Sequence, residues 1–270
     1  MMSATVITPT IGSPHLLECL VSVQRQTHLD LEHVVVVDGN EYTGIVRATV
    51  DRLGSRRIPI HLLSIPRNTG RLKYNGHRIY AAFSYLIESD VTFFLDEDNW
   101  LEDDHVNSCI TTIIDFEVDW AFALRRICRE DGSWLLDDDC DSIGYWPRYE
   151  SYESACDGLS PDLVAFYAEH PFLVDTNCLA ITRHTLTGVA DLWFNGYHAD
   201  AILSTELVRT RVGSSTGTRT VNYRLHEHNE EMMTRYFRDG NDAMQRRYGQ
   251  GFPWRNARRC APIIAPGVGT

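Results

Sequence analysis

Two carboxylates separated by one residue follow a strongly apolar segment of this sequence. Asp96 and Asp98 come directly after the apolar residues 93–95. In an extended chain, residues i and i+2 point to the same side, so both carboxylates can face one ligand. Facing carboxylates repel each other unless a positive charge lies between them, and a divalent cation that prefers oxygen ligands supplies that charge. The pattern predicts a site for a divalent cation at Asp96 and Asp98.

Neither an EF-hand loop nor a helix N-terminus fits this acidic cluster as well. An EF-hand loop beginning at Asp96 would need Gly at its sixth position and Glu at its twelfth, where this chain has Leu101 and Asn107. Acids are also common in the first turn of a helix, which suits Asp103 and Asp104, but Asp96 and Asp98 precede that turn.

The overall charge indicates what such a metal would do. The chain holds 37 acids against 25 bases, a net charge of −12, which argues against nucleic acid as a partner. A metal ion can bridge carboxylates to a diphosphate that an acidic protein would otherwise repel. The sequence lacks the G-x-x-x-x-G-K-[ST] phosphate loop, and no G-x-G-x-x-G follows the first predicted strand.

Composition also bears on location and partners. Seven Cys are scattered without a C-x-x-C pair, which favours the reducing cytoplasm over a disulfide-bonded secreted protein. No run of 18 apolar residues occurs, so we expect no transmembrane segment. Residues 231–270 hold seven Arg against three acids and could dock a second copy of the chain or, peripherally, an anionic inner membrane face.

The first 125 residues alternate strand and helix patterns. Apolar runs predict strands, and apolar spacing typical of helices lies between them. The strands are expected at 5–8, 33–37, 60–64 and 91–95, and the helices at 16–23, 43–53, 76–87 and 103–115. Continuous apolar strands between amphipathic helices predict an α/β fold, with a doubly wound, mostly parallel sheet and helices on both faces.

The second half is less regular. A strand at 120–127 precedes the turn signal Asp131-Gly132 and a short strand at 134–136. An acidic, aromatic loop is expected over 137–160, weaker strands over 174–182 and 221–225, and helices over 199–208 and 230–248. We predict one domain over 1–228, with halves 1–125 and 126–228, followed by a C-terminal helix and tail over 229–270.

The strands place three polar segments at one edge of the predicted sheet. Ligands of such sheets bind at the carboxyl ends of the strands. The segments there are Thr8-Pro9-Thr10, Asp38-Gly39-Asn40 and Asp96-Glu97-Asp98.

These motifs, in this order, resemble inverting glycosyltransferases of family two with the GT-A fold. The resemblance is strong over residues 4–125 and loose over 170–228. It is carried by segments 5–10, 20–27, 34–39, 67–70 and 94–99, the last of which matches the family's D-x-D motif.

The resemblance implies a role for each matching residue in binding a nucleotide-sugar donor. Segment 8–10 corresponds to the lining of the base, and Asp38 to an acid that hydrogen-bonds the base, often uracil, so a UDP-sugar is favoured. Many relatives have two Asp there, where this chain has Val37-Asp38. Asp98 corresponds to the direct ligand of a Mn2+ or Mg2+ ion, and Asp96 to the acid nearer the sugar and ribose. Together with Asp38 and Asp96, the donor-binding candidates are Thr8, Pro9, Thr10, Asn68, Gly70, Arg71, Lys73 and Glu97.

The resemblance also implies a base and a third metal ligand in the second half. An inverting transfer needs one group that deprotonates the acceptor hydroxyl. Asp200 occupies the matching helix start, where an N-capping role is the alternative, and Asp191 and Glu206 are fallbacks. A His after the last sheet segment completes the metal site in some relatives, which points to His226.

The predicted activity is metal-dependent transfer of a single sugar to a hydroxyl acceptor, with inversion. Residues 245–248 do not form the Q-x-x-R-W motif of processive synthases. The alternatives are a hydrolase built on Asp96, Asp98, His226 and His228, a retaining transferase, and a non-catalytic carbohydrate-binding module. The aromatic residues at 134, 145, 146, 149 and 152 could bind the acceptor or close over the donor.

Overall fold

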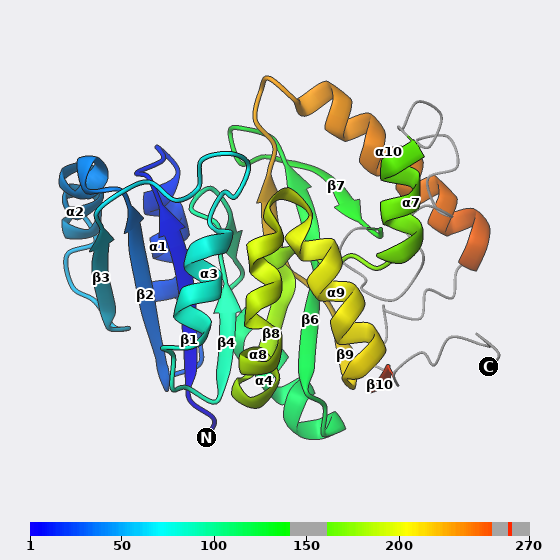
Figure 1. Ribbon diagram of the computed structural model, residues 1–270. Coiled ribbons are helices and arrows are strands. Elements are labelled where there is room, and N and C mark those ends of the chain that lie inside the picture. Colours follow the sequence, from blue (N-terminus) through cyan, green and yellow to red (C-terminus); the bar gives the residue numbers. More distant parts are fainter. Residues whose placement is uncertain (141–160, 250–258, 261–270) are drawn as a thin grey trace.

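The computed structural model describes residues 1–140, 161–249 and 259–260. They build one large mixed sheet with helices on both of its faces (Figure 1).

The strands of this sheet are β1 (Ala4–Thr10), β2 (Leu31–Asp38), β3 (Ile60–Ile65), β4 (Val91–Phe94), β5 (Trp100–Leu101), β6 (Trp120–Cys128), β7 (Trp134–Asp138), β8 (Leu179–Thr182), β9 (Gly213–Arg224) and β10 (Arg259–Cys260). The helices are α1 (Leu16–Gln24), α2 (Thr43–Asp51), α3 (His77–Ser84), α4 (His105–Phe116), α7 (Pro161–Glu169), α8 (Arg183–Val189), α9 (Ala199–Thr210) and α10 (Glu230–Tyr248). Short 3-10 helices cover Asn40–Tyr42, Thr176–Cys178 and Ala190–His198.

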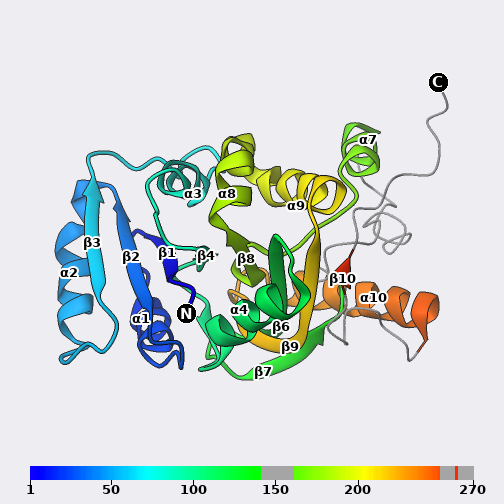
Figure 2. The ribbon, with the colours of Figure 1, turned by 90° about the horizontal axis from the view of Figure 1, so that it is seen from below.

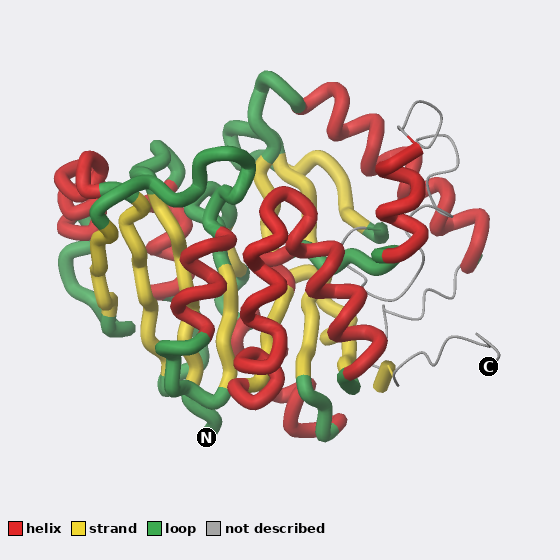
Figure 3. The backbone as a smooth tube through the Cα atoms, in the orientation of Figure 1, coloured by secondary structure: helices red, strands yellow, loops and turns green. Residues whose placement is uncertain are grey.

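Most strands of the sheet run in one direction. The order is β10-β9-β6-β8-β4-β1-β2-β3, and β1, β2, β3 and β4 pair in parallel. β8 runs antiparallel to both of its neighbours, so β6 and its parallel partner β9 point the same way as β4. The carboxyl ends of β1, β2, β3, β4, β6 and β9 therefore meet at one edge, where loops follow them (Figure 3).

Helices cover both faces of the sheet (Figure 2). α3, α8 and α9 lie on one face, and α1, α2 and α4 lie on the other. Under α1 and α2, a small apolar cluster joins Leu16 and Leu20 to Val35 and Val37 of β2. The central strands are buried on both faces, and β1 is buried at every position. This double burial explains the continuous apolar runs that a parallel sheet requires.

The doubly wound, mostly parallel α/β fold that the sequence predicted is confirmed. The predicted strands and helices of the first 125 residues all form, with ends shifted by a few residues, and the helix at 230–248 forms with the predicted bounds. The continuous strand predicted over 174–182 is wrong: residues 176–178 form a 3-10 turn, and only Leu179–Thr182 is strand. Asp175 accepts a hydrogen bond from the amide of Asn177, at 3.0 Å, which caps that turn.

Some elements were not predicted. They are β5, β10, α7, α8 and the three short 3-10 helices, together with the first half of β9, which begins at Gly213 rather than at 221. Most of the predicted loop over 137–160 lies outside the described residues, as do the aromatic residues 145, 146, 149 and 152. In the described part of the chain, no helix is long and apolar enough to cross a membrane.

Candidate functional site

The sheet brings the three predicted polar segments together. In β1, Thr10 is in register with Val37 of β2, and Ile7 is in register with Phe94 of β4. Asp38 is the last residue of β2, and Asp96 follows β4 by two residues. Acidic side chains from two strands therefore lie at the same edge, on either side of the end of β1.

Asp38 is buried, and both of its carboxylate oxygens accept hydrogen bonds from the loop after β3. Its Oδ1 accepts hydrogen bonds from the backbone N–H (2.6 Å) and hydroxyl (3.0 Å) of Thr69. Its Oδ2 accepts a third from the backbone N–H of Gly70, at 2.8 Å. The carboxylate therefore fixes the loop that follows β3 against the end of β2.

The loop after β3 has an unusual backbone. Leu72, Lys73 and Asn75 all adopt left-handed conformations, with φ of 63°, 67° and 48°, which non-glycine residues rarely do. Gly70 is required at its position, because a Cβ there would lie 2.3 Å from the carbonyl oxygen of Asn75. Arg71 and Lys73 are exposed, Asn68 is half-buried, and Nζ of Lys73 lies 5.8 Å from the ring centre of Tyr197.

The end of β1 is held from the Asp96-Glu97-Asp98 segment. Glu97 accepts hydrogen bonds from the hydroxyl of Thr10 and from the backbone N–H groups of Ile11 (3.1 Å) and Ser13 (2.7 Å). Thr8 is buried, and its hydroxyl lies 2.9 Å from Nε2 of His33 in the core. These contacts give Thr8, Thr10 and Glu97 structural partners, whatever else they bind.

Pro9 packs against the start of α3, which ties the end of β1 to the loop after β3. A Cβ added to Gly76 would lie 2.6 Å from Cγ of Pro9, so only glycine allows this approach.

Asp96 lies in a region crowded with negative charge. Its carboxylate accepts hydrogen bonds from the hydroxyl of Tyr80 (2.8 Å) and the amide of Asn177 (3.0 Å). Burial raises the pKa of Asp96 to about 7, and the charges of Asp98 and Asp175 add to this effect. Asp175 is paired with Arg125 and Asp98 with His226, whereas Asp96 forms no ion pair with an Arg, Lys or His among the described residues.

Asp98 begins a row of alternating acidic and imidazole side chains. Its Oδ2 lies 3.0 Å from Nε2 of His226, whose Nδ1 lies 3.0 Å from Oε2 of Glu130. Oε1 of Glu130 lies 2.6 Å from Nε2 of His15. The hydrogen bond with Asp98 raises the pKa of His226, and the hydrogen bond from His15 lowers the pKa of Glu130.

Arg224, at the end of β9, holds the backbone around this row. It is 4% exposed, and its guanidinium donates to the carbonyl of Asp98 at 3.0 Å, to the carbonyl of Glu130 and to the carboxylate of Glu18. It also stacks on Trp100, at 4.7 Å from the ring centre. The strand end that carries Asp98 and the turn that carries Glu130 are therefore fixed to the same side chain.

Sequence reasoning missed Glu130, His15 and Arg224. Glu130 lies in the turn between β6 and β7, and His15 immediately precedes α1. Both are at the carboxyl ends of strands, and applying the strand-end rule to β6 would have pointed to Glu130.

The chemistry of the donor set fits a manganese or magnesium ion. Carboxylate oxygens and an imidazole nitrogen are suitable ligands for Mn2+, and a cation would offset the charge that raises the pKa of Asp96. In the structure, Asp98 and His226 are hydrogen-bonded directly to each other, at 3.0 Å. Across the described ranges, no three His, Cys, Asp or Glu side chains are grouped so that they could hold an ion.

Asp200 lies in the first turn of α9, on the face of the sheet that α3 and α8 also cover. It is half-buried, and its Oδ1 lies 2.9 Å from the backbone N–H of Ala201. The preceding kink has Gly196 at φ 70°, and the carbonyl of Gly196 lies 2.7 Å from Nδ1 of His77. α3 thus anchors the segment that carries Asp200. The fallback bases Asp191 and Glu206 are exposed.

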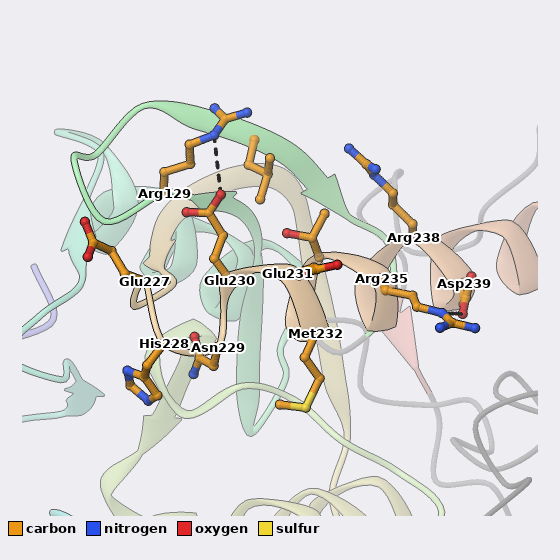
Figure 4. A pocket seen from close by; sticks show the side chains of 12 residues that line it. Arg129, Glu227, His228, Asn229, Glu230, Glu231, Met232, Arg235, Arg238 and Asp239 are labelled. Atoms are coloured by element: carbon orange, nitrogen blue, oxygen red, sulfur yellow. Dashed lines mark ion pairs between the residues drawn. The ribbon is translucent and has the colours of Figure 1, made fainter.

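A groove of about 1110 Å³ adjoins this edge, between the start of α10 and the β6–β7 hairpin. His228, which stacks on His226 with ring centres 5.7 Å apart, is one of its lining residues. Figure 4 shows Arg129 facing Glu230 across the groove, with an ion pair of 3.7 Å. Apart from His228, which belongs to the hydrolase alternative, its described lining includes none of the donor-site, metal or base candidates.

The comparisons with known proteins agree on family and fold. The model of glycosyl transferase family 2 matches residues 5–152. Glycosyltransferase GlyA of Streptococcus pneumoniae serotype 4 is 29% identical over 123 residues, which are 43% of this chain and 16% of that protein.

Solved structures of S. aureus TarS share the fold. TarS 1–349 in complex with UDP-GlcNAc superposes with a TM-score of 0.58 at 14% identity, covering 84% of this chain and 59% of that one. Its complex with UDP gives 0.56 at 13% identity, covering 90% and 66%. The chain therefore matches about a sixth of the length of the curated relative and less than two thirds of the first of these structures.

Proposed function

Because the chain belongs to glycosyl transferase family 2, we propose that it transfers a single sugar from a nucleotide-diphosphate sugar to a hydroxyl acceptor, with inversion. The observation that carries this proposal is the meeting of Asp38, Asp96 and Asp98 at one edge of a parallel sheet, with an imidazole beside them. Ligands of such sheets bind at this edge.

UDP is the favoured nucleotide. The TarS structure that shares this fold was solved with UDP-GlcNAc. Asp38, which resembles the family's base-binding acid, ends β2 next to the end of β1. Arg71 and Lys73 are exposed on the neighbouring loop, where they could contact the diphosphate oxygens as fork and point charge.

Asp98, Asp96 and His226 would hold the Mn2+ or Mg2+ ion. A bound divalent cation stabilises the negative charge that develops on a departing diphosphate. The protein's own contribution is to place these groups: Arg224 fixes the backbone at Asp98, and Asn177 and Tyr80 orient the carboxylate of Asp96.

Asp200 would take the proton from the acceptor hydroxyl as that oxygen attacks the sugar. A base must lie within hydrogen-bonding distance of the hydroxyl. Anchoring through His77 and Gly196 fixes the start of α9, so the position of Asp200 does not depend on a free loop.

Thermal melting against nucleoside diphosphates, with and without Mn2+, tests the donor site. A ligand at 100-fold its dissociation constant adds ~2.7 kcal/mol, which raises the melting temperature by roughly 5–10 °C. We expect the largest rise for UDP with Mn2+, and loss of the Mn2+-dependent part in Asp98→Asn. No rise with any nucleotide would refute the proposal.

Asp200→Asn tests the base, and Asp191→Asn tests the exposed fallback base. We expect Asp200→Asn to lose transfer by at least ~100-fold while UDP with Mn2+ still raises its melting temperature. Asp191→Asn should keep both properties. If Asp200→Asn transfers sugar normally, Asp200 is not the base. Release of free sugar by the wild type regardless of any acceptor would instead favour the hydrolase.

A further inference from the structure

Glu130 lies in the hydrogen-bonded turn between β6 and β7, and its side chain contacts His226 and His15. The backbone N–H of Arg129 donates to the carbonyl of Ser133 and that of Gly132 to the carbonyl of Arg129, both at 2.9 Å, which closes the turn. Arg224 binds the carbonyl of Glu130 from the sheet side. The carboxylate of Glu130 is about one-third exposed, and each of its oxygens faces an imidazole nitrogen.

We infer that Glu130 is a positioning residue that holds the Nδ1–H of His226 and thereby directs Nε2 of that ring toward Asp98. The supporting geometry is the pair of 3.0 Å contacts on opposite sides of one imidazole. Which ligand then meets Nε2 rests on the proposed function. That Glu130 sets the state of the ring does not.

The argument follows from what each group can donate. A neutral imidazole carries one proton, on Nδ1 or Nε2, and the other nitrogen presents a lone pair. An ionised carboxylate only accepts. When Glu130 accepts from Nδ1, the lone pair of Nε2 faces Asp98, which is the arrangement needed to share a cation with that carboxylate. Without Glu130, Nδ1 has no other acidic partner among the described residues, and the proton moves to Nε2, where Asp98 accepts it.

His15 restrains Glu130 in turn. Its Nε2 lies 2.6 Å from the second oxygen of Glu130, and its ring centre lies 6.4 Å from that of His226. Each carboxylate oxygen of Glu130 is therefore hydrogen-bonded to a histidine, and the group cannot rotate away from His226 without breaking a hydrogen bond. A carboxylate behind a ligating imidazole affects metal affinity or activity by about 10–100-fold in other proteins.

The proton position on His226 can be measured directly. We would record ¹⁵N-imidazole NMR spectra at a pH where the ring is neutral, with the His226 signals assigned from His226→Gln. Removing the acceptor in Glu130→Ala should lower the population with the proton on Nδ1. Glu130→Gln should largely restore it, because an amide oxygen also accepts. Asp131→Asn, which removes the neighbouring charge of the same turn, should leave the spectrum unchanged.

Binding of Mn2+ in the presence of UDP gives a second readout, with free Mn2+ measured by electron paramagnetic resonance. Glu130→Ala should raise the dissociation constant of Mn2+ by about 10–100-fold, and Glu130→Gln by less. A residue that only staples the hairpin would lower the melting temperature of both variants without moving the tautomer.

An unchanged tautomer in Glu130→Ala would overturn the inference. If the wild type binds neither Mn2+ nor UDP, the proposed function fails, and the tautomer comparison still decides the role of Glu130.

Discussion

Two histidines that are buried in the core should make folding sensitive to mild acid. His33 and His105 are at most 1% exposed, and burial lowers the pKa of each to about 3 from an ordinary value of 6.5. Below pH 6.5, each of these imidazoles becomes protonated in the unfolded chain but stays neutral in the folded protein. The stability from each neutral imidazole is therefore complete above pH 7 and is lost as the pH falls from 6.5 toward 3.

The magnitude follows from the width of that window. One proton of difference changes the unfolding free energy by about 1.4 kcal/mol per pH unit. Between pH 6.5 and pH 5, each buried histidine should therefore cost the fold about 2 kcal/mol. Asp96 and His226 act in the opposite direction, because their pKa values are raised in the folded protein. A single pH curve of the wild type would mix these effects.

Comparison with His105→Asn isolates one imidazole. An Asn side chain can keep the hydrogen bond that Nδ1 of His105 shares with the hydroxyl of Thr220, at 2.8 Å. Urea unfolding at pH 7 and pH 5 should show the stability deficit of the variant shrinking by about 2 kcal/mol at the lower pH. The exposed His184→Asn is the control, with little effect at either pH. Parallel curves for His105→Asn and wild type would refute the reasoning.

Two further substitutions test the close approaches that hold the sheet and its loops. Gly213→Ala places a Cβ 2.2 Å from the indole of Trp120, so urea unfolding should show a loss of about 1–3 kcal/mol, whereas Gly44→Ala, with open space around it, should not. Asp38→Asn replaces an acceptor oxygen with an NH₂ group opposite a backbone N–H of residues 69–70. It should lower the unfolding free energy by about 1–3 kcal/mol and speed trypsin cleavage of that loop, as mass spectrometry would detect; unchanged cleavage would contradict the role given to the carboxylate.

The sequence predicted the strands and helices whose residue pattern alone indicates their structure. Apolar runs such as 33–37 predicted strands because strands buried on both faces must be apolar throughout. The direction of β8 was not predictable in this way, because an apolar run reads the same in either direction. Residues 176–178 left the predicted strand because Asn177 instead contacts Asp96 and Asp175 through its side chain.

The candidate site was predictable only in part for a similar reason. The spacing of Asp96 and Asp98 is local, and the resemblance pointed to His226, which the structure brings to Asp98. Glu130 and His15 lie in short connections without periodicity, and only the pairing of β6 with β9 brings Glu130 to the ring. The role of Asp200 stays a prediction.

The row formed by Asp98, His226, Glu130 and His15 also determines when, during synthesis, the candidate site can be completed. The strand ends that carry Asp38 and Asp98 are made early and can pair as soon as β4 leaves the ribosome. His226 lies 128 positions after Asp98, beyond the reversed strand β8 and the whole of β9. Until that length has emerged, Asp98 and Glu130 lack the imidazole of His226, which follows β9, and Glu130 has only His15 as an imidazole partner. Completion of the site is thus tied to completion of the sheet.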